Sequence, residues 1–292
     1  MPQTIPPRAL ILLGLLTLVW GTNWPLFALA TREVSVWTFR AVSVAVAGVV
    51  LLTVAHARGQ SLRVPRADWA PIVGATAAYL VVWNVASTYA AILIPSGQAA
   101  ILGFTMPLWA ALIGWALLGQ RLTPRLALAL AMGAAAVALL MWRGLDAYAQ
   151  APLGFFLGLL AGLGWAVGTL ILKRRPILVP ALVLTGWQLL LSALPLTVGA
   201  FVFGEGPWFM PSVASIAVIA WIALVPMAIG NAAWFAIVGM LSAQVAGLSA
   251  LMVPVVAMVS GALMHGEPLG PLQWLAMACS ATALWLTLGR RT

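Results

Sequence analysis

Two stretches of this sequence decide its fold, because they are two versions of one pattern. LLGQRLTPRLALALA spans residues 117–131, and LMHGEPLGPLQWLAMA spans residues 263–278. Both place a Gly, a polar residue, a Leu and a Pro at matching spacing between two apolar runs. The first copy carries Arg121 and Arg125, whereas the second has a Pro and a Leu at those places. A loop that is repeated without its cations needs a physical explanation.

The composition of the chain indicates a helical membrane protein. Of its 292 residues, 64% are hydrophobic and only 7% are charged, against about 25% charged residues in soluble domains. Residues 69–120 and 206–266 contain no Asp, Glu, Lys or Arg. Since a helix needs about 20 apolar residues to cross a bilayer, each run holds at least two spans. The alternating ten-residue segments of an outer-membrane barrel do not occur.

Breaks at charges, Pro/Gly clusters and polar turns predict ten membrane spans. They lie near residues 9–29, 34–56, 69–91, 97–119, 123–142, 153–172, 180–203, 213–237, 244–265 and 271–289. With the N-terminus inside, eleven of the 14 Lys and Arg residues fall on the cytoplasmic side, and only Arg32 and Arg143 fall outside. This bias places both termini in the cytoplasm. Because the cations lie in short loops, the net charge of +9 indicates no nucleic-acid partner.

The two opening stretches belong to a longer internal repeat. Residues 96–143 align with residues 242–290 if one residue is inserted before Pro254. The coinciding pairs are Ser96/Ser242, Gln98/Gln244, Met106/Met252, Pro107/Pro254, Gly114/Gly261, Gly119/Gly266 and Pro124/Pro271, and upstream Asn84/Asn231 and Trp20/Trp165. The halves, 1–148 and 149–292, therefore hold five spans each. Because five is odd, the second half inserts upside down, and its loop lost the cations because it lies on the outer side.

Inverted five-span repeats are the architecture of secondary transporters, in which two halves enclose a midplane site and rock between inward-open and outward-open states. Three stretches, VWGTNWPLFAL, MPLWAALIGWALLGQRLTP and VPVVAMVSGALMHGEPLGP, together with Arg40, resemble the drug/metabolite transporter superfamily with paired EamA domains. Gln120 stands where that family usually has an acid. The resemblance implies an all-α inner-membrane exporter of small neutral metabolites. Within that family, the sequence is most similar to YddG-type exporters of aromatic and other neutral amino acids. The alternative cargo is another metabolite or a drug.

Large and polar residues at midspan depth are the candidate substrate contacts. In the first span, Trp20, Asn23 and Trp24 fall at i, i+3 and i+4 on one helix face. An Asn at that depth needs a partner, and rings that converge on one cavity form an apolar slot. The predicted substrate-binding set is Trp20, Asn23, Trp24, Tyr79, Trp83 and Trp165, with helix packing as the alternative for each.

Repeat-related pairs are the candidate gates and kinks: Pro107/Pro254, Asn84/Asn231 and Gln98/Gln244. A mid-helix proline kinks or unwinds a helix. Inversion puts the paired amides toward opposite sides of the membrane, which suits two gates, although capping and packing are the favoured explanation for any one of them. Arg40 is the only cation inside a predicted span. It either snorkels outward, bonds to carbonyls, or relays a substrate carboxylate.

Several functional classes lack their motifs in this sequence. No GxxxxGK[ST] loop occurs, so this chain is not expected to use ATP. No Asp or Glu lies at midspan, which favours uncoupled transport and disfavours cationic drugs. An intramembrane enzyme would need a paired nucleophile and base, or metal ligands, at midspan. We therefore expect no enzyme activity, no cofactor and no metal, with neutral amino acids and the lipid bilayer as partners. The oligomeric state stays open.

Overall fold

The computed structural model describes residues 6–94, 96–119, 121–143, 145–174, 177–204, 210–241, 246, 250, 252–265 and 270–288. Within these ranges the chain is helical and contains no strand. The helices are α1 (Pro7–Gly21), α2 (Trp24–Ala30), α3 (Val36–Ala57), α4 (Trp69–Thr76), α5 (Val82–Leu93), α6 (Ser96–Gly103), α7 (Met106–Leu118), α8 (Pro124–Arg143), α9 (Leu145–Gln150), α10 (Pro152–Arg174), α11 (Ala181–Phe203), α12 (Val213–Ile222), α13 (Asn231–Met240), α15 (Met252–His265) and α16 (Pro271–Leu288). A 3-10 turn, η1 (Arg66–Asp68), precedes α4, and two π-helical segments, η2 (Ala77–Val81) and η3 (Ala223–Gly230), interrupt longer helices.

Six helical runs among the described residues are long and apolar enough to cross a membrane. They are Val36–Ala57, Arg66–Leu93, Gly97–Leu118, Pro152–Arg174, Ala181–Phe203 and Val213–Met240, which agree closely with six predicted spans. The pair α1 and α2, bent by 41°, makes a seventh if it is one span. Helices satisfy their own backbone hydrogen bonds, so this is the structure that lipid favours. The total of ten spans stays a prediction.

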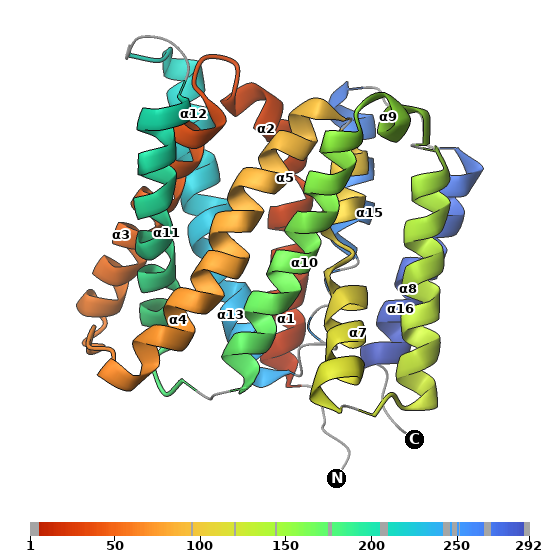
Figure 1. The fold of residues 1–292 in the computed structure, drawn as a ribbon, viewed down its shortest axis with the longest axis horizontal. Helices are drawn as coiled ribbons and strands as arrows, with labels where there is room; N and C mark the ends of the chain where they lie inside the picture. The colour runs from red at the N-terminus through yellow and green to blue at the C-terminus, as the bar shows by residue number, and fades with distance from the viewer. Residues whose placement is uncertain are drawn as a thin grey trace.

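The helices stand roughly side by side as one bundle, and the connections that carry most of the cations lie at one end of it. In Figure 1, α3, α7 and α10 end at the lower edge of the bundle, where α4, α8 and α11 begin. The chain also enters α1 at this lower edge, and α16 ends there. The end of α15 and the start of α16 lie at the opposite, upper edge. The two stretches quoted at the outset are thus at opposite ends.

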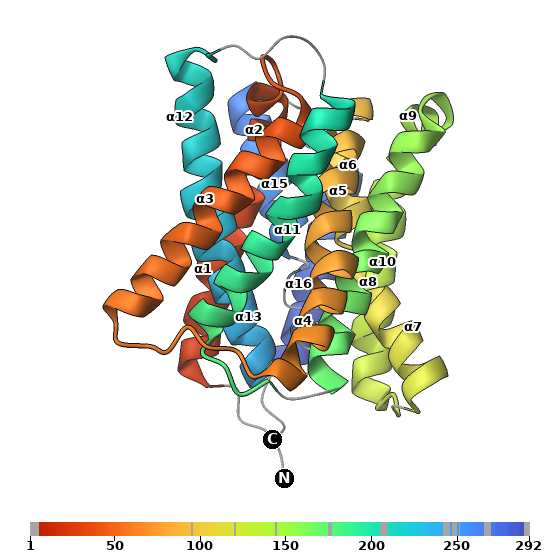
Figure 2. The ribbon, with the colours of Figure 1, turned by 60° about the vertical axis from the view of Figure 1, so that its left-hand side comes forward.

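Helix contacts repeat between the two halves. The second membrane-spanning helix of the first half, α3, packs against the second membrane-spanning helix of the other half, α11. The last helices, α8 and α16, pair in the same way. The first long helix of each half packs against the π-interrupted helix of the other: α1 against η3 and α13, and α10 against η2 and α5. Figure 2 shows α3 and α11 side by side at the front of the bundle. The packing therefore follows the internal repeat.

Glycines on α10 allow its close approach to the first half. A methyl group at Gly158 would lie 2.7 Å from the Cβ of Leu102, and one at Gly162 would lie 2.6 Å from the Thr105 hydroxyl. On another side, a methyl group at Gly168 would lie 2.5 Å from the Cβ of Tyr79. Small residues at such crossings let membrane helices pack backbone against backbone. This contact brings α10 to the centre of the molecule.

Candidate functional site

Aromatic rings from both halves meet at the centre of the bundle. Trp24 of α2 approaches Trp83 of α5 edge to face, with ring centroids 6.1 Å apart. Tyr79 of η2 stacks on Trp165 of α10 at 5.7 Å. Trp20 of α1 meets Trp165 edge to face at 5.4 Å. Such offset and T-shaped pairs are the arrangements that aromatic quadrupoles prefer. The five rings predicted as substrate contacts form one continuous cluster.

A small cavity lies against this cluster. Its lining residues are Trp20, Asn23, Trp24, Phe27, Tyr79, Leu80, Trp83, Asn84, Phe104, Met227 and Asn231. The space inside that is open to the centre of a water molecule is about 20 Å³. One water needs about 10–15 Å³ on that scale, so the cavity holds little more than a single water. An amino acid does not fit in this conformation.

Trp165 is the one predicted substrate residue that does not line the cavity. Its side chain is fully buried, and its ring contacts the rings of Trp20, Tyr79, Trp83, Phe104 and Trp234. Its indole N–H has no hydrogen-bond partner among the described residues. By contrast, the indole N–H of Trp20 donates to the carbonyl of Pro226 in η3, at 3.0 Å. Trp165 thus packs against the rings that line the cavity without lining it itself.

Three asparagines give the cavity its polar surface. The Asn84 amide donates to the Leu80 carbonyl at 2.6 Å, and the Asn231 amide donates to the Met227 carbonyl at 2.9 Å. These repeat partners each follow a π-helical segment, where the wider turn disturbs the regular i to i−4 ladder. The Oδ1 atoms of Asn23 and Asn84 have no partner within the described structure. The Oδ1 of Asn231 accepts from the Tyr79 hydroxyl at 3.4 Å. Unpaired carbonyl oxygens of this kind suit a hydrogen-bond donor.

Arg40 lies behind the cavity wall, buried among aromatic rings. Its side chain is fully buried, which overturns the interpretation that it snorkels to the outer surface. The guanidinium carbon lies 4.2 Å from the ring centre of Phe27 and 4.7 Å from that of Phe39. Its Nε donates to the Thr88 hydroxyl, which donates to the Asn84 carbonyl at 2.7 Å. The two terminal nitrogens of Arg40 have no hydrogen-bond partner in the described part of the chain.

The remaining predicted residues are dispersed. Pro107 lies in the first turn of α7, just after the break at Phe104 and Thr105 that divides the fourth span. Pro254 is the third residue of α15. Gln98 lies on α6, away from the cavity lining, with no hydrogen-bond partner found for its Oε1 among described atoms. Gln244 lies outside the described residues. The gating roles of these residues stay predictions.

The cavity lining also contains Phe27, Leu80, Phe104 and Met227, which are absent from the predicted set, and Trp234 joins the aromatic cluster. Phe104 lies at the break three residues before Pro107, and Met227 lies one turn before Asn231. Trp234 is fully buried, and its ring lies 4.8 Å from that of Trp165. Two of these residues could have been predicted from their spacing to Asn231, because positions i+3 and i−4 share a helix face with residue i. That signal identifies Met227 and Trp234 from Asn231.

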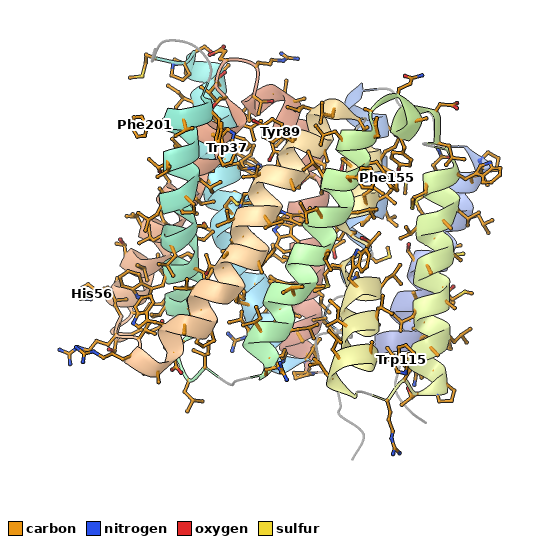
Figure 3. The ribbon with its side chains drawn as sticks, viewed as in Figure 1. Trp37, His56, Tyr89, Trp115, Phe155 and Phe201 are labelled. Atoms are coloured by element: carbon orange, nitrogen blue, oxygen red, sulfur yellow. The ribbon has the colours of Figure 1, made fainter. Side chains whose placement is uncertain are left out.

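Four of the labelled side chains in Figure 3 lie toward the two ends of the bundle. His56 lies at the lower end of α3 and Trp115 near the lower end of α7, while Trp37 and Phe201 lie toward the upper end. Trp115 is 60% exposed, as expected for a ring that faces lipid. Neither His56 nor these rings belong to the cavity lining. The chemistry of the centre therefore rests on aromatic rings, amides and Arg40.

At the upper end, one hydrogen-bonded contact joins the two halves. The Glu33 carboxylate, between α2 and α3, accepts from the Ser212 backbone N–H and from the Ser212 hydroxyl, each at 2.7 Å. Ser212 caps α12 through its hydroxyl, which accepts from the Ser215 N–H. These hydrogen bonds hold the pKa of Glu33 below its usual range. We refer to this pair as the Glu33–Ser212 clasp.

Comparison with known proteins gives consistent results. Residues 7–142 and residues 152–289 each match the model of the EamA-like transporter family. The uncharacterized transporter YvbV of Bacillus subtilis (strain 168) is 24% identical over 272 residues, which are 92% of this chain and 88% of that protein. The uncharacterized inner membrane transporter YedA of Escherichia coli (strain K12) is 25% identical over 281 residues, 94% of this chain and 89% of YedA.

Two further similarities extend the comparison. The probable amino-acid metabolite efflux pump of Escherichia coli (strain K12) is 26% identical over 207 residues, which are 67% of this chain and 68% of that protein. A solved structure named only "Crystal structure of protein" superposes with a TM-score of 0.76 at 21% identity, covering 96% of both chains. At that identity the superposition demonstrates a shared fold.

Proposed function

This chain belongs to the EamA-like transporter family, and we propose that it exports small neutral amino acids, aromatic and other hydrophobic ones in particular, across the inner membrane. The observation that carries the proposal is the central cavity, whose walls combine tryptophan and tyrosine rings with three asparagine amides. An apolar slot with a few placed polar groups is the usual form of a small-molecule site. The alternative cargo is another metabolite or a drug.

The ammonium group and the side chain of the substrate would contact different parts of the cavity wall. The unpaired Oδ1 atoms of Asn23 and Asn84 are acceptors that suit an ammonium group. The rings of Trp24 and Trp83 offer apolar surface for a ring or aliphatic side chain. The name of the amino-acid metabolite efflux pump of Escherichia coli, 26% identical over part of the chain, supports the same class of cargo.

The conformation described here is closed, so transport requires the rings to separate. A cavity of about 20 Å³ has no room for an amino acid. In an inverted-repeat transporter, the halves rock about a central site and expose it to one side at a time. We propose that opening at either end separates the α1–α2 unit from its neighbours, with Pro107, Pro254 and Gln98 near the moving joints.

The location and energetics complete the proposal. A multi-pass protein of the inner membrane accounts for the apolar spans, and YedA is named for that membrane. Both termini face the cytoplasm, according to the positive-inside bias. Transport is uncoupled from protons, since no Asp or Glu lies within a predicted span. The family is one of transporters, and we assign no enzyme activity to the chain.

Counterflow in proteoliposomes tests this function. Purified protein should exchange labelled Phe and Leu without ATP, and an imposed pH difference alone should not drive accumulation. Trp24→Ala should reduce exchange of Phe about tenfold relative to Ala, because it removes apolar wall. Asn23→Ala should slow all three amino acids alike. Absence of exchange for every neutral amino acid would reject the cargo class, and unchanged rates and preference in both variants would reject this cavity as the site.

A further inference from the structure

Arg40 is the feature of the centre that packing alone does not explain. It carries a full positive charge at a fully buried position. No carboxylate of the described residues contacts it, and its terminal nitrogens find no acceptor there. The five acidic residues of the whole chain all lie outside the predicted spans. A buried charge without a counter-ion is strongly unfavourable, so some other group must compensate for it.

The cation–π contacts of Arg40 offset only part of this cost. Phe27 and Phe39 present their rings to the guanidinium at 4.2 and 4.7 Å. Such contacts stabilise a cation but leave its hydrogen-bond donors unused. The donors with no partner are on the terminal nitrogens, the pair that binds a carboxylate in bidentate geometry. Guanidinium donors in this arrangement suit the two oxygens of a carboxylate.

Only one side chain layer separates the guanidinium from the cavity. Phe27 lines the cavity and also stacks on Arg40. Thr88 links the Nε of Arg40 to the backbone of Asn84, which lines the same cavity. Phe27 belongs to α2, the short helix bent by 41° relative to α1. A rotation of this ring or of α2 would therefore expose the guanidinium to the cavity.

We propose that Arg40 is the binding site for the carboxylate of the substrate and that Phe27 is the shutter that covers it in the closed state. This inference rests on the proposed function and narrows its cargo to molecules that carry an anionic group. The ammonium would meet the Asn23 and Asn84 oxygens, while the carboxylate replaces the Phe27 ring as the partner of the guanidinium. Binding of the anion then holds α2 in its displaced position.

Two analogues of leucine separate the charges for a test. 4-Methylpentanoate has the carboxylate without the amino group, and leucinamide has the amino group without the carboxylate. Binding to purified full-length protein in detergent is measured by isothermal titration calorimetry, and competition by counterflow of labelled leucine. In the wild type we expect 4-methylpentanoate and leucine to bind, and leucinamide to bind at least about tenfold more weakly.

Four variants assign this preference to the proposed residues. Arg40→Met should weaken 4-methylpentanoate at least about tenfold, and Arg40→Lys should restore part of the loss because it keeps the charge. Arg32→Met is the matched control, since it removes an exposed arginine, and should bind like the wild type. Phe27→Leu removes the aromatic cover and should tighten 4-methylpentanoate binding about threefold or more. A purely structural Arg40 predicts no gain in Phe27→Leu.

The outcomes distinguish this inference from the proposed function. If leucine is exchanged but leucinamide competes as well as leucine in the wild type, and Arg40→Met binds 4-methylpentanoate as tightly as the wild type does, the anion site is rejected and the amino-acid transport stands. If leucine is not exchanged but 4-methylpentanoate binds in an Arg40-dependent way, the amino-acid function is rejected and the anion site stands. Equal or weaker carboxylate binding in Phe27→Leu overturns the shutter.

Discussion

The two halves of the molecule share a helix arrangement but contribute unequally to the centre. Trp20 and Trp165 are repeat partners, yet only Trp20 lines the cavity and hydrogen-bonds to a carbonyl. Of all the lining residues, only Met227 and Asn231 come from the second half. The fifth residue of α3 is Arg40, whereas the fifth of α11 is Thr185, whose hydroxyl donates to Ala181. Duplication preserved the frame, and the halves then acquired different chemistry.

The two halves therefore have different roles: one forms the cavity wall and the other supports it. The first half supplies most cavity-facing groups, while α10 of the second half supplies the buried ring on which several of them rest. In the proposed alternating-access mechanism, this inequality would let the polar and charged first half make most of the contacts to the substrate while the second half moves.

The largest expected effect concerns the inversion itself and is all or none. In a Cys279→Ser background, cysteines replacing Arg121 or Glu267 are tested with a membrane-impermeant thiol reagent on intact cells. We expect labelling of the Glu267 position only, because the two repeated loops lie on opposite sides of the membrane. Labelling of both positions, or of neither before lysis, would contradict the inverted arrangement of the halves.

Removal of the supporting ring should affect stability more than removal of a wall ring. Trp165→Ala leaves a void inside a packed aromatic cluster, with a cost of about 3–5 kcal/mol in the free energy of unfolding. Trp24→Ala should cost less, because its void joins the cavity that already lies beside this ring. Thermal unfolding in detergent provides the comparison. A smaller loss of stability in Trp165→Ala than in Trp24→Ala would contradict the supporting role of Trp165.

Phenylalanine substitutions sharpen the contrast between the two repeat partners. Trp20→Phe removes the donor to the Pro226 carbonyl and should cost about 1 kcal/mol more than the lost ring area alone. Trp165→Phe removes a donor that has no partner within the described structure, so this additional cost is absent. The two variants lose the same atoms, and each therefore controls for the other. Equal stabilities, measured by thermal unfolding, would remove the hydrogen-bonding difference between the halves.

The smallest expected effect concerns the Glu33–Ser212 clasp, which joins the halves at the surface. Because its hydrogen bonds lower the pKa of Glu33, the folded state favours the ionised carboxylate. Its contribution is therefore present above the usual carboxyl pKa and is lost as the pH falls through the lowered value. The stability difference between wild type and Glu33→Gln should be small at neutral pH and vanish in acid, with Arg32→Gln as the control. A difference that grows in acid would contradict this sign.

Much of the helix arrangement followed from the sequence, because apolar length and the repeat are strong signals. Spacing placed Trp20 and Trp24 on one face of a single continuous helix; the structure breaks that helix between them, into α1 and α2, and both rings still line the cavity. The role of Trp165 could not be deduced, since depth in the membrane does not determine which neighbour a ring faces. Phe104 escaped notice because it lies in a break rather than on a regular helix face.

The π-helical segments and the environment of Arg40 illustrate the same limit. One extra residue in a turn rotates everything after it, and no apolar period reveals where the turn widens. Asn84 and Asn231 follow the two widened turns, but this relation is visible only after the segments η2 and η3 are known. For Arg40 the sequence left three alternatives: a side chain that reaches the outer interface, one bonded to carbonyls, and one that contacts a substrate carboxylate. Its actual position depends on Phe27 and Thr88, which come from other helices.

The small size of the closed cavity has a consequence for the energy supply of the cell. Water molecules in an unbroken file conduct protons, so a permanently wet pathway would discharge the proton gradient across the membrane. The cavity of about 20 Å³, lined by rings and amides, leaves room for little more than one isolated water. Apolar constrictions can stop permeation by excluding water. In the conformation described here, this cavity therefore offers no unbroken file of water.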